Sequence, residues 1–139
     1  MAGPRILIID DDHDVLLTAR MFLEQLEFDV TVLSNPENIL SQIDREHFDV
    51  ILLDMNFSLD TTSGEEGLSF LTWLSQSNFV IPVIAMMGWS NVDLAVNAMR
   101  LGACDFVEKP FSPREIVLRI NRVVRERNLK LDAQKAHDE

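Results

Sequence analysis

The chain of 139 residues lacks several features that assign a protein to a class at first sight. It has a single cysteine, Cys104, and cannot form an internal disulfide, which suits a reducing, cytoplasmic compartment. No apolar run approaches the roughly 20 residues that a membrane-spanning helix needs. Residues 1–5 show no signal-peptide pattern before the first apolar segment. We therefore expect a cytoplasmic protein that makes no contact with a membrane.

Positive charge is scarce as well. The chain has 12 lysines and arginines against 23 aspartates and glutamates, which gives a net charge of −11. Because phosphate contacts need clustered lysine and arginine, we expect no direct contact with nucleic acid. The sequence also has no glycine-rich phosphate-binding loop, no cluster of cysteine and histidine, and no internal repeat.

Hydrophobic residues make up 47% of the chain, enough for one domain with a sizeable core. Several short aliphatic runs are typical of strands buried on both faces of a parallel sheet. We place strands at residues 5–9, 30–33, 49–54, 80–87 and 104–108. Apolar spacing and capping signals predict helices at about 14–27 and 36–45, around 68–74, at about 91–102, and from 113 onward.

The order of elements is a strand followed by a helix, five times over. Alternating units of this length predict a parallel sheet with right-handed crossovers and helices on both faces. We therefore predict an α/β, flavodoxin-like fold with five strands doubly wound in the order 2-1-3-4-5. One domain covers residues 1–125. Residues 126–139 are charged and polar, and we expect a helical extension or the start of a linker to a further domain.

Four short motifs mark helix ends. Asn35-Pro36 is a typical N-cap followed by proline at the first helical position. Ser90-Asn-Val-Asp93 resembles a capping box with aspartate in place of the usual glutamate, and Ser112-Pro-Arg-Glu115 is a complete one. Gly102 is a typical left-handed residue at the end of a helix.

Acidic residues follow two strands that lie side by side in the predicted sheet. Asp10 and Asp11 follow the first strand, and Asp54 ends the third. Ligands bind outside the carboxyl ends of strands in such sheets, so these residues are placed for chemistry. Three nearby carboxylates need a compensating cation, and oxygen ligands of this number favour Mg²⁺. Lys109, after the fifth strand, would reach the same edge and add a second positive charge.

Each of these residues also has an ordinary explanation. Asp54 alone could open a loop, Lys109 alone could be a surface lysine, and the acidic run at 10–12 could complement a helix N-terminus. We accept the last explanation for Asp12 and Asp14. The combination is far more specific than any of its parts. It consists of Asp10-Asp11 after the first strand, Asp54 at the end of the third, and Lys109-Pro110 after the fifth.

Three segments together resemble the receiver domain of bacterial two-component response regulators. They are Ile6-Leu-Ile-Ile-Asp-Asp-Asp12, Val50-Ile-Leu-Leu-Asp54 and Gly102-Ala-Cys-Asp-Phe-Val-Glu-Lys-Pro-Phe111. The resemblance covers about residues 4–125. It is closest to receivers of enhancer-binding transcriptional activators, which work with the alternative sigma factor. Trp89-Ser-Asn-Val-Asp-Leu-Ala-Val96 and the long last helix point in the same direction.

The resemblance implies a signalling role and not an enzymatic one. Asp54 would take a phosphoryl group from a phosphohistidine on a sensor histidine kinase, and the domain would then switch an output domain that controls transcription. Asp11 and Asp54 would bind Mg²⁺ directly, with Asp10 acting mostly through water. The backbone carbonyl of Asn56 would add a ligand, and Lys109 would pair with a phosphoryl oxygen.

The resemblance also assigns a conformational switch. Pro110 would follow a cis peptide bond, and Phe106 occupies the aromatic switch position, although packing in the core explains a phenylalanine there equally well. The family usually has serine or threonine where this chain has Met87, which carries no hydrogen-bond donor. The backbone N–H of Gly88 could still hold the phosphoryl group, and Ser90 could supply the missing hydroxyl.

The loop after Asp54 departs from the family pattern twice. Ser58 replaces a common proline, and the expected glycine is Gly67, which makes the loop longer than usual. Because extra loop length costs little free energy, we interpret the insertion as a feature for a partner or for access.

Three other functions compete with a phosphorylated switch. A receiver-like interaction module that never takes phosphate is favoured by Met87. An enzyme of the haloacid-dehalogenase type would need a second aspartate where the chain has Asn56. A flavodoxin-like cofactor site would need hydrogen-bond donors after the first strand, where the chain has three acids.

The last helix carries an apolar stripe that is interrupted at residues 127–128. Its members are Val117, Ile120, Val124 and Leu131. We expect Val117 and Ile120 to pack on the sheet, and the part past Val124 to pair with a second chain in a homodimer. A single heptad is too short to be stable alone, so a frayed, solvated tail is the alternative.

Overall fold

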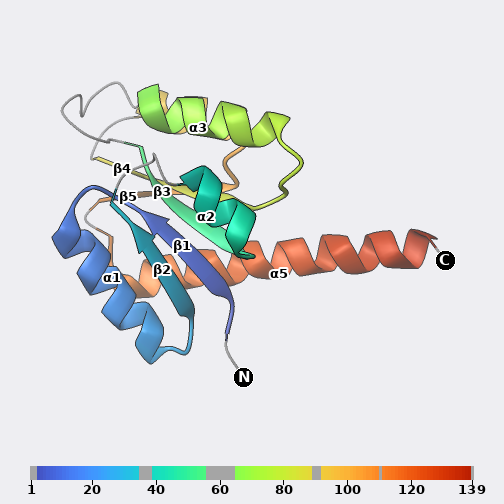
Figure 1. Cartoon of the computed structure of the whole chain (residues 1–139), viewed down its shortest axis with the longest axis horizontal. Helices are drawn as coiled ribbons and strands as arrows, with labels where there is room; N and C mark the ends of the chain where they lie inside the picture. The colour runs from blue at the N-terminus through green and yellow to red at the C-terminus, as the bar shows by residue number, and fades with distance from the viewer. Residues whose placement is uncertain (1–2, 35–38, 56–64, 89–91, 110, 139) are drawn as a thin grey trace.

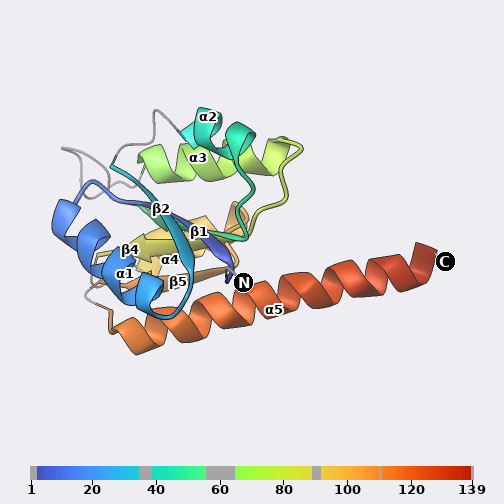
Figure 2. The ribbon, with the colours of Figure 1, turned by 60° about the horizontal axis from the view of Figure 1, so that its bottom comes forward.

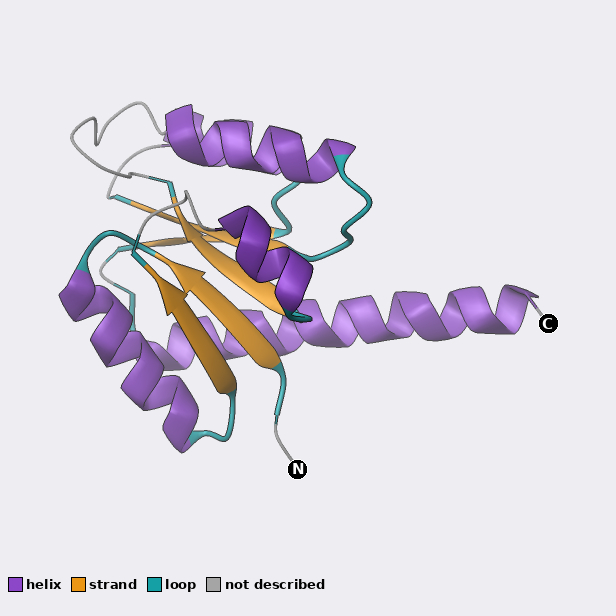
Figure 3. Ribbon diagram, in the orientation of Figure 1, coloured by secondary structure: helices purple, strands orange, loops and turns teal. Residues whose placement is uncertain are grey.

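The structure, a computed structural model, describes residues 3–34, 39–55, 65–88, 92–109 and 111–138. Its strands are β1 Arg5–Ile9, β2 Asp29–Leu33, β3 Val50–Asp54, β4 Val83–Met87 and β5 Asp105–Glu108. They form one parallel sheet in the order β2-β1-β3-β4-β5 (Figures 1 and 3). The predicted fold class and strand order are confirmed.

Both faces of the sheet are buried, which explains the unbroken aliphatic runs. In β3, Ile51 and Leu53 belong to one buried cluster of side chains. Their neighbours Val50 and Leu52 belong to a second cluster on the opposite face. Side chains alternate between the faces of a strand, so a strand covered on both sides must be apolar at every position.

Five helices complete the described part of the chain. Helices α1 (His13–Gln25) and α5 (Pro113–Asp138) contribute to the cluster on one face (Figure 2). Helices α2 (Ile39–Arg45), α3 (Glu65–Gln76) and α4 (Val92–Arg100) contribute to the cluster on the other. The two faces are thereby closed, and the edge where the strands end is left to the loops. None of the described helices is both long enough and apolar enough to span a membrane.

Two predicted boundaries are wrong by a few residues. Strand β4 begins at Val83 instead of Val80, and Val80 is 81% exposed. Pro82 accepts a bond from the N–H of Ile51 but has no N–H of its own to donate, so the ladder starts after it. Helix α1 ends at Gln25, because Glu27 has a φ of 70° and turns the chain back toward the sheet.

The helix ends predicted at Gly102 and Ser112 are confirmed, although the side chain of Glu115 pairs with Arg119 instead of completing the capping box. Gly102 ends the turn after α4 with a φ of 114°, a backbone conformation that favours glycine. The hydroxyl of Ser112 accepts a hydrogen bond from the N–H of Glu115 at 3.1 Å. The caps predicted at Asn35-Pro36 and at Ser90 lie outside the described residues.

Helix α5 is much longer than the other helices and runs unbroken through the boundary predicted at residues 125–126. Its first half packs under the sheet, and its second half projects beyond the rest of the domain (Figures 1 and 2). Ile116, Ile120 and Val123 are buried there, while Val117 is only half-buried. The prediction that this helix packs through Ile120 is confirmed, and Val117 lies at the edge of the contact.

Candidate functional site

Three carboxylates meet at the carboxyl ends of β1 and β3. Ile9 pairs with Leu53 in the sheet, so Asp10 and Asp54 leave neighbouring strands side by side. One oxygen from each of Asp10, Asp11 and Asp54 lies within 4.8 Å of the others. Asp10 is 0% and Asp54 is 1% exposed, whereas Asp11 faces solvent. The three acids that the sequence places at this edge are therefore brought together.

Lys109 reaches the same cluster from the end of β5. Its Nζ lies 2.5 Å from Oδ2 of Asp10 and 3.3 Å from Oδ1 of Asp54. Burial of the ammonium would lower the pKa of Lys109, but the hydrogen bond to Asp10 and the charges of both carboxylates outweigh it and raise that pKa above 10.5. Lys109 is therefore a permanent cation between two buried carboxylates at neutral pH.

The two carboxylate oxygens of Asp10 are both engaged. Oδ2 accepts from Lys109, and Oδ1 accepts from the N–H of Asp12 at 2.9 Å. The side chain of Asp12 turns away and caps α1 by accepting from the N–H groups of Asp14 and Val15. The helix-capping explanation of Asp12 is confirmed. The buried carboxylate of Asp10 fixes the position of the Lys109 ammonium.

The donor set of this cluster suits a small divalent cation. Carboxylate oxygens from Asp11 and Asp54 are hard ligands, and the exposure of Asp11 leaves a side open to water. Mg²⁺ keeps several waters and is usually bound by one or two carboxylates, which matches this arrangement. Asn56, the source of the expected carbonyl ligand, lies outside the described residues.

The predicted switch residues Met87 and Phe106 pack on the face of the sheet that α4 covers. Met87 is 1% exposed and belongs to the same buried cluster as Leu94 and Ala95 of α4. Its carbonyl accepts the N–H of Lys109 at 2.8 Å, which fixes the end of β5 against β4. Phe106 is half-buried and packs against the same cluster.

The remaining switch positions are less fully described. Gly88, which follows β4 directly, is half-buried. Ser90 and Pro110 lie outside the described residues, as does Ser58.

Gly67 makes a close contact beside the site that the sequence analysis did not predict. Gly67 lies in the first turn of α3, and a Cβ added there would sit 2.9 Å from Sδ and 3.1 Å from Cα of Met55. Met55 is fully buried and directly follows Asp54. The glycine therefore lets α3 close onto the residue beside the acid, although the sequence marked it only by its resemblance to a family pattern.

Comparisons with known proteins identify the family of this fold. Residues 6–121 match the family model of the response regulator receiver domain. The transcriptional regulatory protein PrrA of Mycobacterium leprae is 31% identical over 127 residues, which are 91% of this chain and 52% of PrrA. The doubly wound sheet and its acidic edge define a receiver-type fold, and the chain belongs to the family of response regulator receiver domains.

Solved structures show the same architecture. NtrX from Brucella abortus superposes with a TM-score of 0.85 at 26% identity, over 98% of this chain and 30% of the NtrX chain. Full-length FixJ from B. japonicum superposes with a TM-score of 0.80 at 28% identity, over 91% of this chain and 60% of FixJ. The chain thus spans about half the length of PrrA and less of NtrX. Its sequence relatives include transcriptional regulators, as expected from the sequence.

Proposed function

We propose that Asp54 is the phosphoacceptor of this receiver domain. The observation that carries the proposal is the position of its carboxylate, buried at the end of β3, within 3.3 Å of Lys109 and beside Asp10 and Asp11. A carboxylate oxygen of Asp54 would attack the phosphorus of a phosphohistidine on a sensor kinase. The phosphorus–nitrogen bond then breaks, its electron pair returns to the imidazole, and an acyl phosphate forms on Asp54.

The other residues of the cluster have supporting roles in this transfer. Mg²⁺, when bound, offsets the negative charge of the transferred phosphoryl group. Asp11 and Asp54 would hold the ion, and Asp10 would act on it through water because Lys109 and Asp12 engage its oxygens. Lys109 is within reach of Asp54 and would turn its ammonium to a phosphoryl oxygen.

We further propose that the domain acts inside the cell as part of a longer transcriptional regulator. Its relative PrrA and its structural neighbour NtrX are both longer than this chain. A boundary near residue 125 would separate the receiver domain from a helical connection to an output domain. The domain itself would take up one phosphoryl group per chain and would not turn over as an enzyme.

A second candidate is a receiver domain that is never phosphorylated. The specific observation that favours it is Met87, whose side chain is buried against α4 where the family usually has a hydroxyl. Mixing the domain with acetyl phosphate, with and without Mg²⁺, and measuring its mass separates the two candidates. A Mg²⁺-dependent gain of one phosphoryl group supports the phosphoacceptor, and no gain supports the interaction module.

Pairing of two chains through the part of α5 past Val124 is also proposed. Ile120 is buried against the sheet, as expected, and is not part of this surface. Leu129 and Leu131 are exposed on the second half of the helix and would have to form the contact. Light scattering at high protein concentration tests this, and a monomer both with and without a phosphoryl mimic would contradict it.

A further inference from the structure

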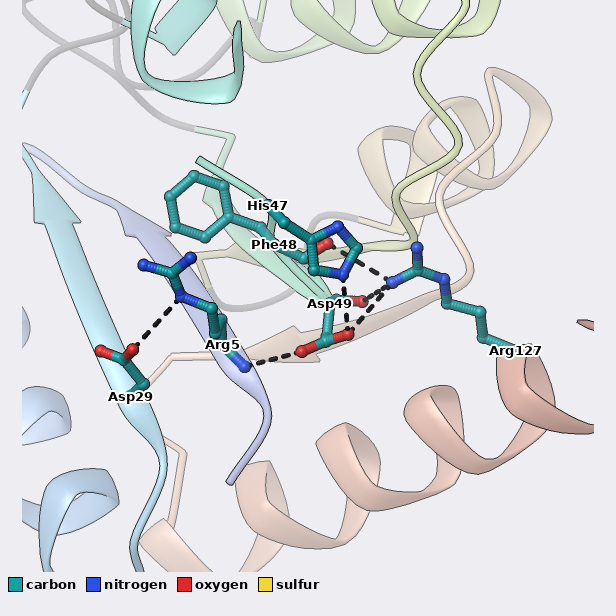
Figure 4. A network of polar contacts seen from close by, with 6 residues as sticks. All are labelled: Arg5, Asp29, His47, Phe48, Asp49 and Arg127. Atoms are coloured by element: carbon teal, nitrogen blue, oxygen red, sulfur yellow. Dashed lines mark hydrogen bonds and ion pairs between the residues drawn. The ribbon is translucent and has the colours of Figure 1, made fainter. Parts of the chain in front are cut away.

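Helix α5 is tied to the rest of the domain at two polar points, Arg119 and Arg127. Near its start, Nη1 of Arg119 lies 2.8 Å from Oδ1 of Asp105 on β5. Further along, Arg127 reaches the segment that leads into β3 (Figure 4). Ile120 and Val123 pack between these points. Two fixed points on one rigid helix define the direction in which it leaves the domain.

The contact made by Arg127 gathers three oxygens on one side of its guanidinium. Nη1 lies 3.4 Å from the carbonyl of Phe48, 3.3 Å from the carbonyl of Asp49 and 3.4 Å from Oδ1 of Asp49. Each distance is longer than the roughly 2.9 Å of a typical N–H···O bond, so each bond is weak and they act as a set. Arg127 is only 19% exposed, which confines the guanidinium to this position.

Beyond this point, the side chains that the structure describes, at residues 128–133, are all exposed. Leu129 and Leu131 are exposed. A groove of about 520 Å³ separates this part of the helix from the end of α3 and the segment before β4, with Phe79, Val80 and Leu131 among its lining residues. A helix of about a dozen residues is marginal in water when nothing packs against it. Among the described side chains of α5, Arg127 is therefore the last that is bonded to the rest of the domain.

The carboxylate of Asp49 has hydrogen-bond partners other than Arg127. Oδ2 of Asp49 accepts the N–H of Arg5 at 2.8 Å, and Oδ1 lies 3.2 Å from Nε2 of His47 (Figure 4). If Arg127 left, the carboxylate would keep both of these partners, and the guanidinium would swing into solvent. Removing a hydrogen bond is costly mainly when it leaves a buried group unsatisfied, and the carboxylate of Asp49 would not be left so.

We propose that Arg127 is a releasable latch that fixes the direction of the second half of α5. Its anchor, Asp49, directly precedes β3, and the other end of β3 carries Asp54. The latch joins the connection toward any following domain to the strand that bears the acidic cluster. Arg127 is a positioning residue, and its role is independent of phosphoryl transfer, so the latch and the proposed function can fail separately.

The test compares Arg127→Ala with Arg125→Ala, which removes an exposed arginine two residues away on the same helix. Alanine is a better helix former than arginine, so neither substitution lowers the intrinsic helicity of α5. In a Cys104→Ser background, spin labels at Leu17→Cys on α1 and Asp132→Cys on α5 report the direction of the helix. Amide hydrogen exchange of residues 128–138 reports its stability.

We expect one narrow label-to-label distance distribution for the parent and for Arg125→Ala, and a broad one for Arg127→Ala. Exchange of residues 128–138 should be roughly tenfold faster in Arg127→Ala alone. Arg127→Lys keeps the charge, but its side chain is one bond shorter and would not bring the ammonium to the position of Nη1. It should therefore also broaden the distribution, and it serves if the alanine variant does not fold. A distribution as narrow as that of the parent in an Arg127 variant that folds would overturn the proposal.

Discussion

The ammonium of Lys109 lies closer to Asp10, at 2.5 Å, than to the proposed phosphoacceptor Asp54, at 3.3 Å. Asp10 is thus the main partner of Lys109 while Asp54 carries no phosphoryl group. A phosphoryl group on Asp54 would add acceptor oxygens near the same ammonium. Mg²⁺ would then neutralise part of the negative charge of Asp10. The site therefore contains a cation that can change partners without leaving the cluster.

The first prediction concerns the charge of Lys109 and uses the raised pKa. Because the pKa is higher in the folded state than in the unfolded state, the stability that it contributes is fully present below the unfolded value of about 10.4. That stability is lost as the pH rises through the folded pKa, which lies above 10.5. Without Mg²⁺, Lys109→Met should lower the free energy of unfolding by about 3–5 kcal/mol at neutral pH, because two carboxylates stay buried without their cation.

Urea unfolding of the parent and of Lys109→Met over a series of pH values measures this difference. Lys130→Met, which removes an exposed lysine on α5, is the control and should change the free energy little. The gap between the parent and Lys109→Met should stay open from neutral pH to about pH 10 and then narrow. A gap that narrows below pH 9 would contradict the assigned ion pairs.

The second prediction separates two neighbouring acids. Asp11→Ala should weaken Mg²⁺ binding strongly and change stability little, because Asp11 is the exposed member of the acidic cluster that we propose to bind the ion. Asp12→Ala should lower stability by about 1 kcal/mol through loss of the α1 cap and leave Mg²⁺ affinity nearly unchanged. Titration calorimetry with Mg²⁺ and urea unfolding of both variants measure the two effects. Equal losses of Mg²⁺ affinity would remove the special role of Asp11.

The third prediction concerns the close contact between α3 and Met55. Gly67→Ala places a Cβ against Met55, so we expect a loss of about 1–3 kcal/mol in the free energy of unfolding. Met55 directly follows Asp54 in the chain. A displaced Met55 should therefore also shift the NMR signal of the backbone amide of Asp54. Gly102→Ala is a useful comparison, since its Cβ meets nothing within 4 Å and its cost comes from backbone strain alone. An unchanged Asp54 signal in Gly67→Ala would show that the contact does not position the acid.

The sequence predicted the acidic cluster well because strand ends in a parallel sheet are set by the topology. Once Asp10, Asp54 and Lys109 each follow a strand, the sheet order alone brings them together. The contact between Arg127 and Asp49 was not predictable in this way. It depends on which way the long helix α5 is turned at residue 127. The sequence shows there only that a polar residue interrupts the apolar stripe. Boundaries such as the start of β4 failed for a local reason, since Pro82 removes one donor from the ladder.

The fourth prediction concerns Met87. A hydrogen bond to a charged group is worth roughly 1.5–3 kcal/mol, so a hydroxyl at this position should increase the population shift on phosphorylation by roughly 10- to 150-fold. Met87→Thr should therefore enlarge the amide shift changes of β4 and α4 when a phosphoryl mimic is added. It should also lower stability, because the side chain is part of the core.

Met86→Thr is the matched control for this experiment. Met86 is as deeply buried as Met87 but belongs to the cluster on the opposite face of the sheet. It should lose stability without enlarging the response to the mimic. If the parent already responds as strongly as Met87→Thr, the missing hydroxyl has no influence on the switch.

The central claim is that Asp54 takes the phosphoryl group, and intact-mass measurement after treatment with acetyl phosphate tests it most directly. Asp54→Asn keeps the shape of the side chain but removes the nucleophile, and its amide spectrum should show an intact fold. The account predicts that the parent gains the mass of one phosphoryl group when Mg²⁺ is present, and that Asp54→Asn gains none. A variant that is phosphorylated at the parent rate, or a folded parent that never gains the mass with Mg²⁺, would contradict it.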